Sequence, residues 1–290
     1  MSFRTVVITR QSKISYKNRF LVVKKESEEK YVHLSEIDTI IVDSISVSIS
    51  AYLLKELAEN KINIIFCDEK HNPFGELSPY YSRHNTSKQI KEQIQWKKLS
   101  KDTLWQKIVE NKILNQALLL KKIKSSKNKL LLSYIDEIQL GDKTNREGHA
   151  AKVYFNELFG KNFSRNDSNN INAALNYGYA ILLSTINKEV VSNGYLTQLG
   201  IHHKNEFNEF NLTCDIMEPF RIIIDNFVYY NQDRDFDSSY KLDIVNIFNN
   251  SFKYAGKRYV LKDIIKMYVK NTLEAINNIE KYKGFNYDEG

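Results

Sequence analysis

The sequence predicts an α+β protein in which a small, mainly β domain comes first and a larger, all-α domain follows. Up to residue 68 the chain is rich in short β-branched and aromatic runs separated by polar turns, the pattern of β-strands. From about residue 83 onward, hydrophobic residues recur at helical spacing instead. The 290 residues, 42% hydrophobic and 27% charged, are enough for one large or two modest domains with buried cores.

The first domain is expected to be an antiparallel sheet or sandwich. A helix is expected to interrupt the strands from Ser50, because this serine precedes apolar residues at Tyr52, Leu53 and Leu57. The expected strands are residues 5–10, 12–16, 19–25, 31–34, 37–43 and 63–68.

The domain boundary is placed in residues 72–79, which hold two of the three prolines of the chain. This gives a β-domain of residues 1–79 and a helical domain of residues 80–290. The helical period opens with a long amphipathic stretch that begins at Ile90. Further helices are expected to begin near Asn145, near Asp167 or Ser168, at Asp215 and near Leu261.

The chain is basic, with 42 Lys and Arg against 35 Asp and Glu. A polyanionic partner such as nucleic acid suits this charge, but many basic proteins bind nothing anionic. A lysine cluster in residues 120–132 is either the solvated face of a helical pair or a DNA-contacting patch. It contains Lys121, Lys122, Lys124, Lys127 and Lys129.

Cys67 and Cys214 are the two cysteines, and they form no CxxC pattern. Neither a disulfide scaffold nor a thiolate zinc site is therefore expected, and a reducing cytosol fits. The N-terminus has no apolar core followed by a cleavage site, and no run approaches the roughly 20 apolar residues of a membrane span. A soluble cytoplasmic protein is expected.

The segment NREGHAAKVYFNELFG, residues 145–160, contains the first candidate site residue, Glu147. With Asn145 as helix cap, Glu147 lies on the same stripe as Ala151, Tyr154 and Leu158, which draws a carboxylate toward the core side. The alternative is a carboxylate in the first turn that favours the helix dipole and still reaches water.

The segment GIHHKNEFNEFNLTCDIMEPFR, residues 200–221, gathers further candidates. Asp215 and Glu218 are three residues apart, so on a helix they share a face and could bind one divalent cation. The same spacing is a capping box with Asp215 as N-cap, which a proline directly after Glu218 supports. The adjacent His202 and His203 point to opposite sides of an extended segment, so one of them joins a given site.

An imidazole with two or three carboxylates suits a hard divalent metal such as Mg²⁺ or Mn²⁺, which would polarise a phosphodiester. The chain has no GxGxxG, GxxxxGKS/T, GxSxG or HExxH motif. Nucleotide-fuelled enzymes, α/β-hydrolases and zincins therefore have no motif support.

Taken in order and spacing, these two segments and NAALNYGYAILLS, residues 172–184, resemble the CRISPR-associated integrase, the universal first Cas protein of spacer acquisition. SPYYSRHNTSKQIKEQIQWKK (78–98) and HLSEID (33–38) extend the resemblance over nearly the whole chain. It is greatest for the form found in type II systems, subtype A. Departures are NGYLTQLG (193–200), where a GlyLeuAspPro-like turn is commoner, and Ile222, where a proline is frequent.

The resemblance implies a dimer-forming β-domain and a helical catalytic domain whose Mg²⁺ or Mn²⁺ ligands are a Glu, a His and an acidic residue. By motif these are Glu147, His203 and Glu218, with Asp215 as an auxiliary or supporting group. The family's Gly-x-x-His pattern, starting at Gly200, selects His203 over His202.

Several basic residues near these motifs are candidates for contact with DNA phosphates, against ordinary surface or capping roles. Arg83, beside Tyr80, Tyr81 and His84, could grip nucleic acid or pack between the domains. The other candidates are Arg146, Lys161, Arg165 and Arg221.

The function that the resemblance implies is metal-dependent joining of the 3′-hydroxyl ends of short DNA fragments into a repeat array. The implied partners are DNA, a second copy of the chain, a small ferredoxin-like second Cas protein, further type II adaptation proteins and the RNA-guided effector nuclease. Two alternatives stay open: a stand-alone nuclease or branched-DNA resolvase, and a non-catalytic DNA-binding scaffold of the same fold.

Overall fold

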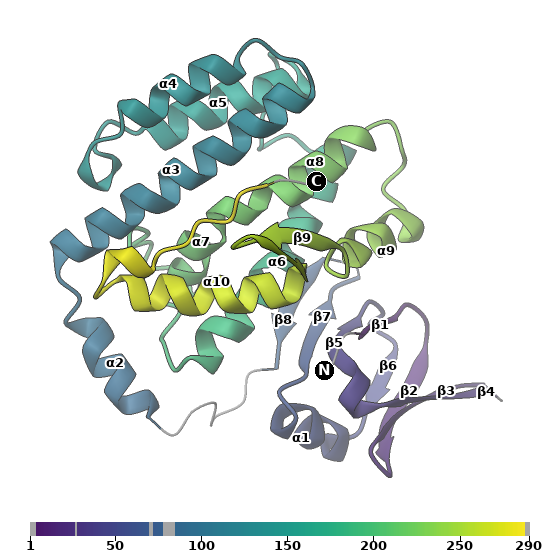
Figure 1. Ribbon diagram of the computed structural model, residues 1–290. Helices are drawn as coiled ribbons and strands as arrows, with labels where there is room; N and C mark the ends of the chain where they lie inside the picture. Colours follow the sequence, from purple (N-terminus) through teal and green to yellow (C-terminus); the bar gives the residue numbers. More distant parts are fainter. Residues whose placement is uncertain (1–3, 27, 70–71, 78–84, 288–290) are drawn as a thin grey trace. The chain divides into compact units, whose positions relative to one another are not determined.

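The computed structural model describes residues 4–26, 28–69, 72–77 and 85–287 (Figure 1). Contacts between residues divide the chain into two compact units, Met1–Ser82 and Arg83–Gly290. The sequence placed the boundary between residues 79 and 80, in a stretch outside the described residues.

In its described residues, the first unit has two four-stranded sheets. The first has the spatial order β1 (Arg4–Ile8), β5 (Ile37–Val42), β7 (Asn63–Cys67) and β8 (Pro73–Glu76). The second has the order β4 (Glu28–His33), β3 (Phe20–Lys25), β2 (Ser12–Lys17) and β6 (Val47–Ile49). The short 3₁₀ helix η1 (Leu34–Glu36) joins β4 to β5.

The pairing in these sheets is mixed, so the expectation of an antiparallel arrangement is wrong in part. β1, β5 and β7 are parallel neighbours, and β6 runs parallel to β2. Helix α1 (Ala51–Glu59) lies between β6 and β7 in the chain and gives the long crossover that leads into a parallel strand. β8 lies inside the segment predicted as a boundary, where its chain turns back antiparallel to β7.

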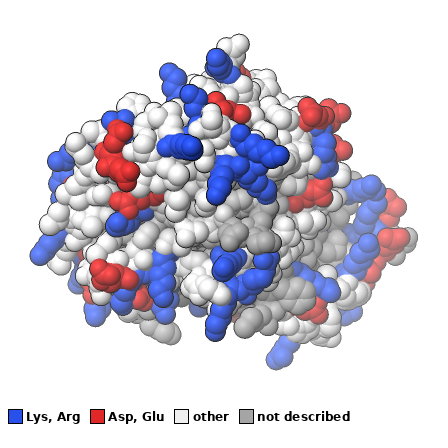
Figure 2. Space-filling model, turned by 45° about the horizontal axis from the view of Figure 1, so that its top comes forward, with Lys and Arg blue, Asp and Glu red and all other residues white. Residues whose placement is uncertain are grey.

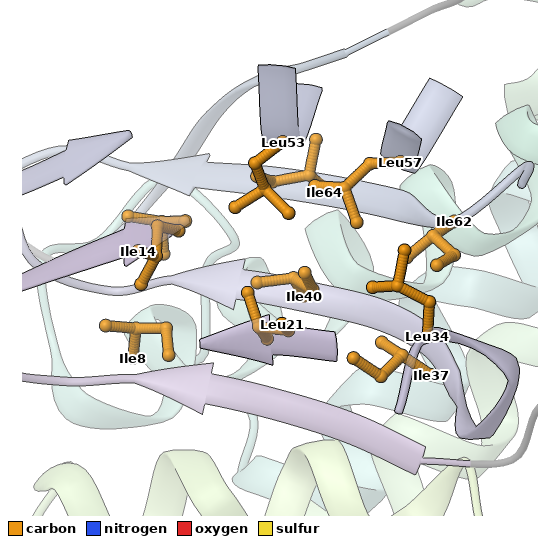
Figure 3. Close-up of a cluster of buried hydrophobic side chains, with 11 residues drawn as sticks. Ile8, Ile14, Leu21, Leu34, Ile37, Ile40, Leu53, Leu57, Ile62 and Ile64 are labelled. Carbon is orange, nitrogen blue, oxygen red and sulfur yellow. The ribbon is translucent and has the colours of Figure 1, made fainter. Parts of the chain in front are cut away.

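One hydrophobic core is shared by both sheets and α1 (Figure 3). Ile14 and Leu21 come from the second sheet, Ile40 and Ile64 from the first, and all are fully buried. From α1, Leu53 and Leu57 are fully buried, whereas Tyr52 is 56% exposed. The hydroxyl of Ser50 accepts a hydrogen bond from the backbone N–H of Leu53, so the predicted cap is confirmed.

The second unit is built mainly from helices. Helix α3 packs against α4, α5 and α8, and helix α6 packs against α7, α8, α9 and α10. The helices are α2 (Thr86–Ile94), α3 (Lys98–Lys122), α4 (Asn128–Asp136), α5 (Arg146–Phe159), α6 (Asn170–Ser192), α7 (Asn211–Met217), α8 (Arg221–Tyr230), α9 (Ser238–Ile247) and α10 (Leu261–Ala275). Three 3₁₀ helices lie between or after them: η2 (Leu140–Asp142), η3 (Glu218–Phe220) and η4 (Ile279–Lys281).

A β-hairpin interrupts the helices, so the second domain is helical but not all-α. β9 (Ser251–Tyr254) pairs antiparallel with β10 (Lys257–Val260). Ala255 and Gly256 both have positive φ angles, which a tight two-residue hairpin turn requires. No helix in the described part of the chain is long and apolar enough to cross a membrane.

Candidate functional site

Glu147 is held at the start of α5 by a double cap. Asn145 adopts a left-handed conformation and its side chain accepts a hydrogen bond from the N–H of Gly148, which confirms the predicted cap. The carboxylate of Asp142 accepts hydrogen bonds from the N–H groups of Arg146 and Glu147, at 2.8 and 3.0 Å. The first turn of the helix is therefore fixed, and with it the backbone from which the Glu147 side chain extends.

The predicted apolar stripe of α5 is confirmed at Tyr154 and Leu158, but its first member is Ala150 rather than Ala151. Ala150, Tyr154 and Leu158 are buried, four residues apart, whereas Ala151 is only partly buried. Glu147 lies one turn before Ala150, and its side chain is 22% exposed. The carboxylate is thus drawn toward the core side of the helix, as the spacing predicted.

Glu218 lies at the junction of α7 and α8, in the 3₁₀ turn η3. Its side chain is only 4% exposed, and a cation lies against each of its oxygens. Arg221 Nε donates to Oε1 at 2.9 Å, and Lys112 Nζ lies 2.5 Å from Oε2. Lys112 Nζ also donates to Glu147 Oε1 at 2.5 Å, so this ammonium from α3 lies between the two predicted acidic ligands.

These contacts determine the charge state of the cluster. Burial would raise the pKa of Glu218, but the positive charges of Arg221 and Lys112 outweigh it and lower that pKa to about 2. Burial would lower the pKa of Lys112, but the carboxylates of Glu218 and Glu147 raise it above its usual value. Glu218 is therefore an anion and Lys112 a cation at neutral pH.

Asp215 has a different position from the one predicted. α7 begins at Asn211, so Asp215 is inside the helix rather than its N-cap. Its carboxylate, which is fully buried, accepts hydrogen bonds from three consecutive backbone N–H groups, those of Ile201, His202 and His203, at 2.6, 2.9 and 3.1 Å. The capping-box prediction failed because the helix starts one turn earlier and the carboxylate satisfies a neighbouring loop instead.

Gly200 permits this turn by its lack of a side chain. A Cβ at Gly200 would lie against the carbonyl oxygen of His203 and only 2.8 Å from Asp215 Oδ2. Contacts of that length to backbone and to a buried carboxylate are sterically excluded. A glycine is therefore needed three residues before His203, because the loop wraps tightly around the carboxylate of Asp215.

The same carboxylate orients the imidazole of His203. His203 Nδ1 lies 2.6 Å from Asp215 Oδ1, so Nδ1 carries the proton and Nε2 retains its lone pair in the neutral ring. This hydrogen bond raises the pKa of His203 above its usual value, burial opposes the rise, and the charges of Glu218 and Glu147 add to it. A carboxylate on one imidazole nitrogen is the usual support of a histidine that binds metal through the other.

His202 is part of the packing. Its ring stacks on Trp105 with centroids 4.3 Å apart and planes 5° apart, and burial lowers its pKa. His203 meets the same tryptophan edge-on at 5.7 Å. The two histidines therefore do not point to opposite sides as an extended segment would require, because the chain bends here. They differ instead in that only His203 bonds to Asp215 through its ring.

A cavity of about 480 Å³ opens beside His203. Its lining combines two lysines, Lys101 and Lys204, with two carboxylates, Glu206 and Glu209, with amide side chains and with one tryptophan, Trp96. Because the two carboxylates balance the two lysines, the charge of this lining does not by itself select an anionic ligand.

Two of the predicted DNA-contacting arginines converge on one tyrosine. The guanidinium of Arg221 lies 4.6 Å from the ring centroid of Tyr179, and that of Arg165 lies 5.4 Å from it. Arg165 also donates to the side chains of Asn172 and Asn176. Arg221 is thus next to Glu218, and Arg165 is brought near the site through Tyr179.

Two other predicted DNA contacts, Arg146 and Lys161, are not brought into this cluster. Arg146 pairs with Glu137 at 2.9 Å and lies over Tyr134, on the α4 side of α5. Lys161 is exposed just after α5. Arg83 lies outside the described residues. The lysine cluster of residues 120–132 is exposed between the end of α3 and α4.

The sequence did not single out Lys112, Trp105 or Asn115, although each is buried beside the site. The available signal was an excess of polar residues inside the apolar middle of α3. Asn111, Lys112, Asn115 and Gln116 are all buried there, and buried polar groups need specific partners. Asn115 supplies such a bond to the carbonyl oxygen of Pro219, next to Glu218.

The donor set suits Mg²⁺ or Mn²⁺ in type, since it consists of two carboxylates and one imidazole. Glu218 Oε2 is buried, and its partner is the Lys112 ammonium, a cation in the position that a metal bound to this oxygen would take. As placed, however, no three His, Cys, Asp or Glu side chains in the described part of the chain are arranged to hold one ion. Lys112 lies between the two carboxylates that would have to share it.

Comparison with known proteins gives consistent results. A sequence profile of the family described as CRISPR associated protein Cas1 matches residues 5–239. The CRISPR-associated endonuclease Cas1 of Neisseria meningitidis serogroup C (strain 8013) is 38% identical over 226 residues, which cover 78% of this chain and 74% of the relative.

Two solved structures share the fold. A chain of a Cas6-RT-Cas1–Cas2 complex matches with a TM-score of 0.76 at 20% identity, covering 99% of this chain but 36% of that longer one. A casposase bound to integration product matches with a TM-score of 0.73 at 18% identity, covering 100% of this chain and 96% of the casposase. From the profile match and the sequence identity, the chain belongs to the Cas1 family of CRISPR-associated proteins.

Proposed function

We propose that this chain is a metal-dependent DNA endonuclease and integrase of CRISPR adaptation, which joins the 3′-hydroxyl ends of short DNA fragments into the repeat array. The observation that carries the proposal is the oriented imidazole of His203, fixed by Asp215 beside the acidic pair Glu147 and Glu218. The name of the Neisseria relative, an endonuclease, and the casposase structure with its integration product support the same function.

Glu147, His203 and Glu218 would hold Mg²⁺ or Mn²⁺, which polarises the scissile phosphodiester and stabilises its developing charge. Arg221 and Arg165 supply further positive charge at the rim of the site for the phosphate backbone. Asp215 keeps the proton of His203 on Nδ1.

The attacking group in this proposal belongs to the DNA. The 3′ oxygen of the fragment forms a bond to the target phosphorus, and the bond from phosphorus to the 3′ oxygen of the flanking target strand breaks. The hydroxyl proton of the fragment is lost and the departing 3′ oxygen gains one, so the number of phosphodiesters is unchanged. No serine or cysteine nucleophile is needed, and the protein contributes alignment and charge.

The proposed partners are DNA, a second copy of the chain and a small ferredoxin-like second Cas protein. The presence of Cas1 together with Cas2 in the Cas6-RT-Cas1–Cas2 complex supports the last of these. Self-association is proposed for residues 1–79, where the aromatic side chains of Phe20 and Tyr31 are 36% and 48% exposed. Type II adaptation proteins and the RNA-guided effector nuclease are further proposed partners.

A joining assay tests the function. The protein, with and without its ferredoxin-like partner, is mixed with a short duplex bearing 3′ hydroxyls, a supercoiled plasmid with leader and repeat, and Mn²⁺ or Mg²⁺. Covalent joining at the repeat ends is the expected product. Nicking without joining would favour the stand-alone nuclease, and binding without any metal-dependent product would favour the non-catalytic scaffold.

Variants assign the site within that assay. Glu147→Gln, His203→Ala and Glu218→Gln are each expected to reduce joining by at least about a hundredfold, the scale of losing a ligand or its orientation. His149→Ala is the matched control, because His149 is exposed on the same helix as Glu147. Full joining by His203→Ala would remove this histidine from the site.

A further inference from the structure

The side chain of Lys112 occupies the centre of the proposed metal site. Its ammonium lies 2.5 Å from Glu147 Oε1 and 2.5 Å from Glu218 Oε2, and the side chain is 11% exposed. The two carboxylates come from α5 and η3, which are far apart in sequence, and Lys112 comes from the middle of α3. One cation of the chain thus bridges the two acidic residues that the proposed function requires as ligands.

The Lys112 ammonium neutralises negative charge on the two carboxylates that would otherwise destabilise the folded protein. Glu218 is 4% exposed, and removing one partner of such a buried carboxylate leaves an unpaired charge in a medium of low polarity. Arg221 compensates one of its oxygens, through Nε at 2.9 Å, and Lys112 compensates the other. Without Lys112, Glu147 and Glu218 would repel each other across the site.

The bridge is also incompatible with a shared metal ion in the same place. A divalent ion that binds both carboxylates lies about 2.0–2.2 Å from each oxygen, in the space that this ammonium fills. An ammonium has only donors and cannot act as a ligand. Its charge opposes the approach of a second cation, and removing it relieves that opposition.

We propose that Lys112 is a tethered competitor for the metal, which must leave the two carboxylates before the ion can bind them. This inference rests on the proposed function, because it assigns a role toward the ligands of that site. Lys112 is a positioning residue here, since it acts through Glu147 and Glu218.

The displaced ammonium needs a new anionic partner, because a lysine so little exposed is not well compensated by water alone. A phosphodiester oxygen of bound DNA is the anion that the proposed reaction brings to this position. Metal binding and DNA binding therefore favour each other, and metal affinity is weak until DNA is present.

Mn²⁺ binding, measured by electron paramagnetic resonance of the free ion, tests this without any reaction. In the absence of DNA, Lys112→Met is expected to bind Mn²⁺ at least about tenfold more tightly than the wild type, since one competing unit charge has gone. Lys107→Met is the matched control, because Lys107 lies on the same helix and pairs with Glu110 on the surface. It is expected to bind as the wild type does.

A second measurement adds DNA to the wild type and to Lys112→Met. A duplex with dideoxy 3′ ends, which cannot join, is expected to tighten Mn²⁺ binding of the wild type by at least about tenfold, and that of Lys112→Met by much less. Lys112→Gln, which keeps a polar head group without the charge, replaces the methionine variant should that one fail to fold.

Two results would overturn the competitor role. One is a folded, uncharged variant at position 112 whose Mn²⁺ affinity equals or falls below that of the wild type. The other is a wild-type affinity that DNA leaves unchanged. Glu218→Gln shows where the ion binds. Any Mn²⁺ that this variant still binds is bound at another site. If Mn²⁺ binding responds to Lys112 as expected but the protein does not join DNA, that result counts against the proposed function and not against the role of Lys112.

Discussion

Asp215 combines two tasks in one carboxylate, since it holds three backbone N–H groups and the ring of His203. Asp215→Asn keeps the shape of the side chain but removes its charge. If His203 is a metal ligand as proposed, we expect Mn²⁺ affinity to fall by about 10- to 100-fold, the usual cost of losing the residue that orients such a ligand. Asp243→Asn, at an exposed ion pair with Arg234, is the control.

The same variant has a second readout. Because the hydrogen bond that His203 Nδ1 donates to Asp215 raises the pKa of His203, Asp215→Asn should lower that pKa. An NMR titration of the ring protons in the presence of a chelator measures this directly. An unchanged pKa, together with unchanged Mn²⁺ affinity, would show that Asp215 supports only the loop.

The turn before His203 gives a prediction about stability. Gly200→Ala places a Cβ against the carbonyl oxygen of His203, so the loop must shift away from Asp215. Overpacking of this kind costs about 1–3 kcal/mol of unfolding free energy. Urea unfolding measures it, with Gly75→Ala as control because a Cβ at Gly75 meets no atom within 4 Å. Equal stability of the two variants would contradict the steric account.

Single residues were predictable from the sequence where the signal is local. Asn145 and Ser50 were identified as caps because a cap bonds within three residues of itself. Asp215 shows the opposite case: its pattern fits a capping box, but its partners are 12 to 14 residues away. Lys112 was missed because nothing in a run of apolar residues tells which carboxylates a buried lysine will meet.

At the scale of elements, α3 organises the site by way of its buried asparagines. Asn115 donates to the carbonyl oxygens of Pro219 and Phe285 at 2.9 and 2.7 Å and accepts from the N–H of Tyr287. Asn111, one turn earlier, bonds both backbone groups of Phe285. The C-terminal segment is thereby fixed on α3, next to the residue that follows Glu218.

Asn115→Ala should therefore lower the free energy of unfolding. It leaves buried backbone groups without partners, each of which costs about 1–3 kcal/mol, so we expect a loss of about 2 kcal/mol or more in unfolding free energy. Denaturant unfolding measures this loss. Asn60→Ala is the control, because Asn60 also donates to a helix carbonyl but is exposed. A loss no larger than that of the control would show that the segment is held by its apolar contacts alone.

The junction of α5, α6 and α8 contains a buried carboxylate that makes stability depend on pH. Asp225 accepts hydrogen bonds from the hydroxyls of Tyr154 and Tyr179. Burial raises its pKa from 3.8 to about 6, although both hydroxyls and the charge of Arg221 oppose the rise. Because the folded state binds this proton more tightly, its stabilising contribution is complete below pH 3.8 and is lost as pH rises through 6.

Asp225→Asn cannot lose that proton, so it should remove this part of the pH dependence. The unfolding free energy of the variant minus that of the wild type is expected to increase between pH 4 and pH 7, by up to about 3 kcal/mol. Denaturant unfolding at several pH values in this range gives the difference. Parallel curves for the two proteins would contradict a raised pKa at Asp225.

Elements were predicted better than their pairing. Six strands of the first unit and the start of α10 at Leu261 were predicted from local composition and period, whereas the short strands β6 and β8 were missed. Parallel pairing of β1 with β5 joins residues more than 30 positions apart, and alternation along a strand does not say which neighbour it takes. The hairpin β9–β10 was missed because its strands have four residues each, too few for a clear period.

At the scale of the whole molecule, the order of a β unit and a helical unit was predicted from the change of period and is confirmed by the fold. The assignment to type II, subtype A stays a prediction. The convergence of α3, α5 and η3 on one charged cluster could not be read from one sequence, because it depends on packing between Lys112 and residues 35 and 106 positions further along the chain. The resemblance supplied Glu147 and Glu218, and the structure added the lysine between them.

The positive charge on the face that Figure 2 shows is distributed rather than concentrated. On the face shown in Figure 2, Lys and Arg side chains form several groups separated by uncharged surface and by smaller acidic groups. A net charge of +7 favours DNA in general, but it does not say which lysines make contact. The salt dependence of binding distinguishes contacting lysines from the rest, since each neutralised phosphate releases counterions.

Lys121, Lys127 and Lys129 belong to the exposed cluster at the α3–α4 connection, and their replacement by Gln removes three charges. If they contact phosphates, the slope of log K against log salt should fall in magnitude by up to about 3, roughly 0.9 per contact. Fluorescence anisotropy with a labelled duplex from about 50 to 200 mM salt measures it. The matched control replaces three exposed lysines of the first unit, Lys13, Lys17 and Lys30. Both variants have the same net charge, so a smaller slope in the cluster variant alone identifies phosphate contacts. An equal decrease of the slope in both variants reflects only overall charge. An unchanged slope in the cluster variant excludes the cluster from the interface.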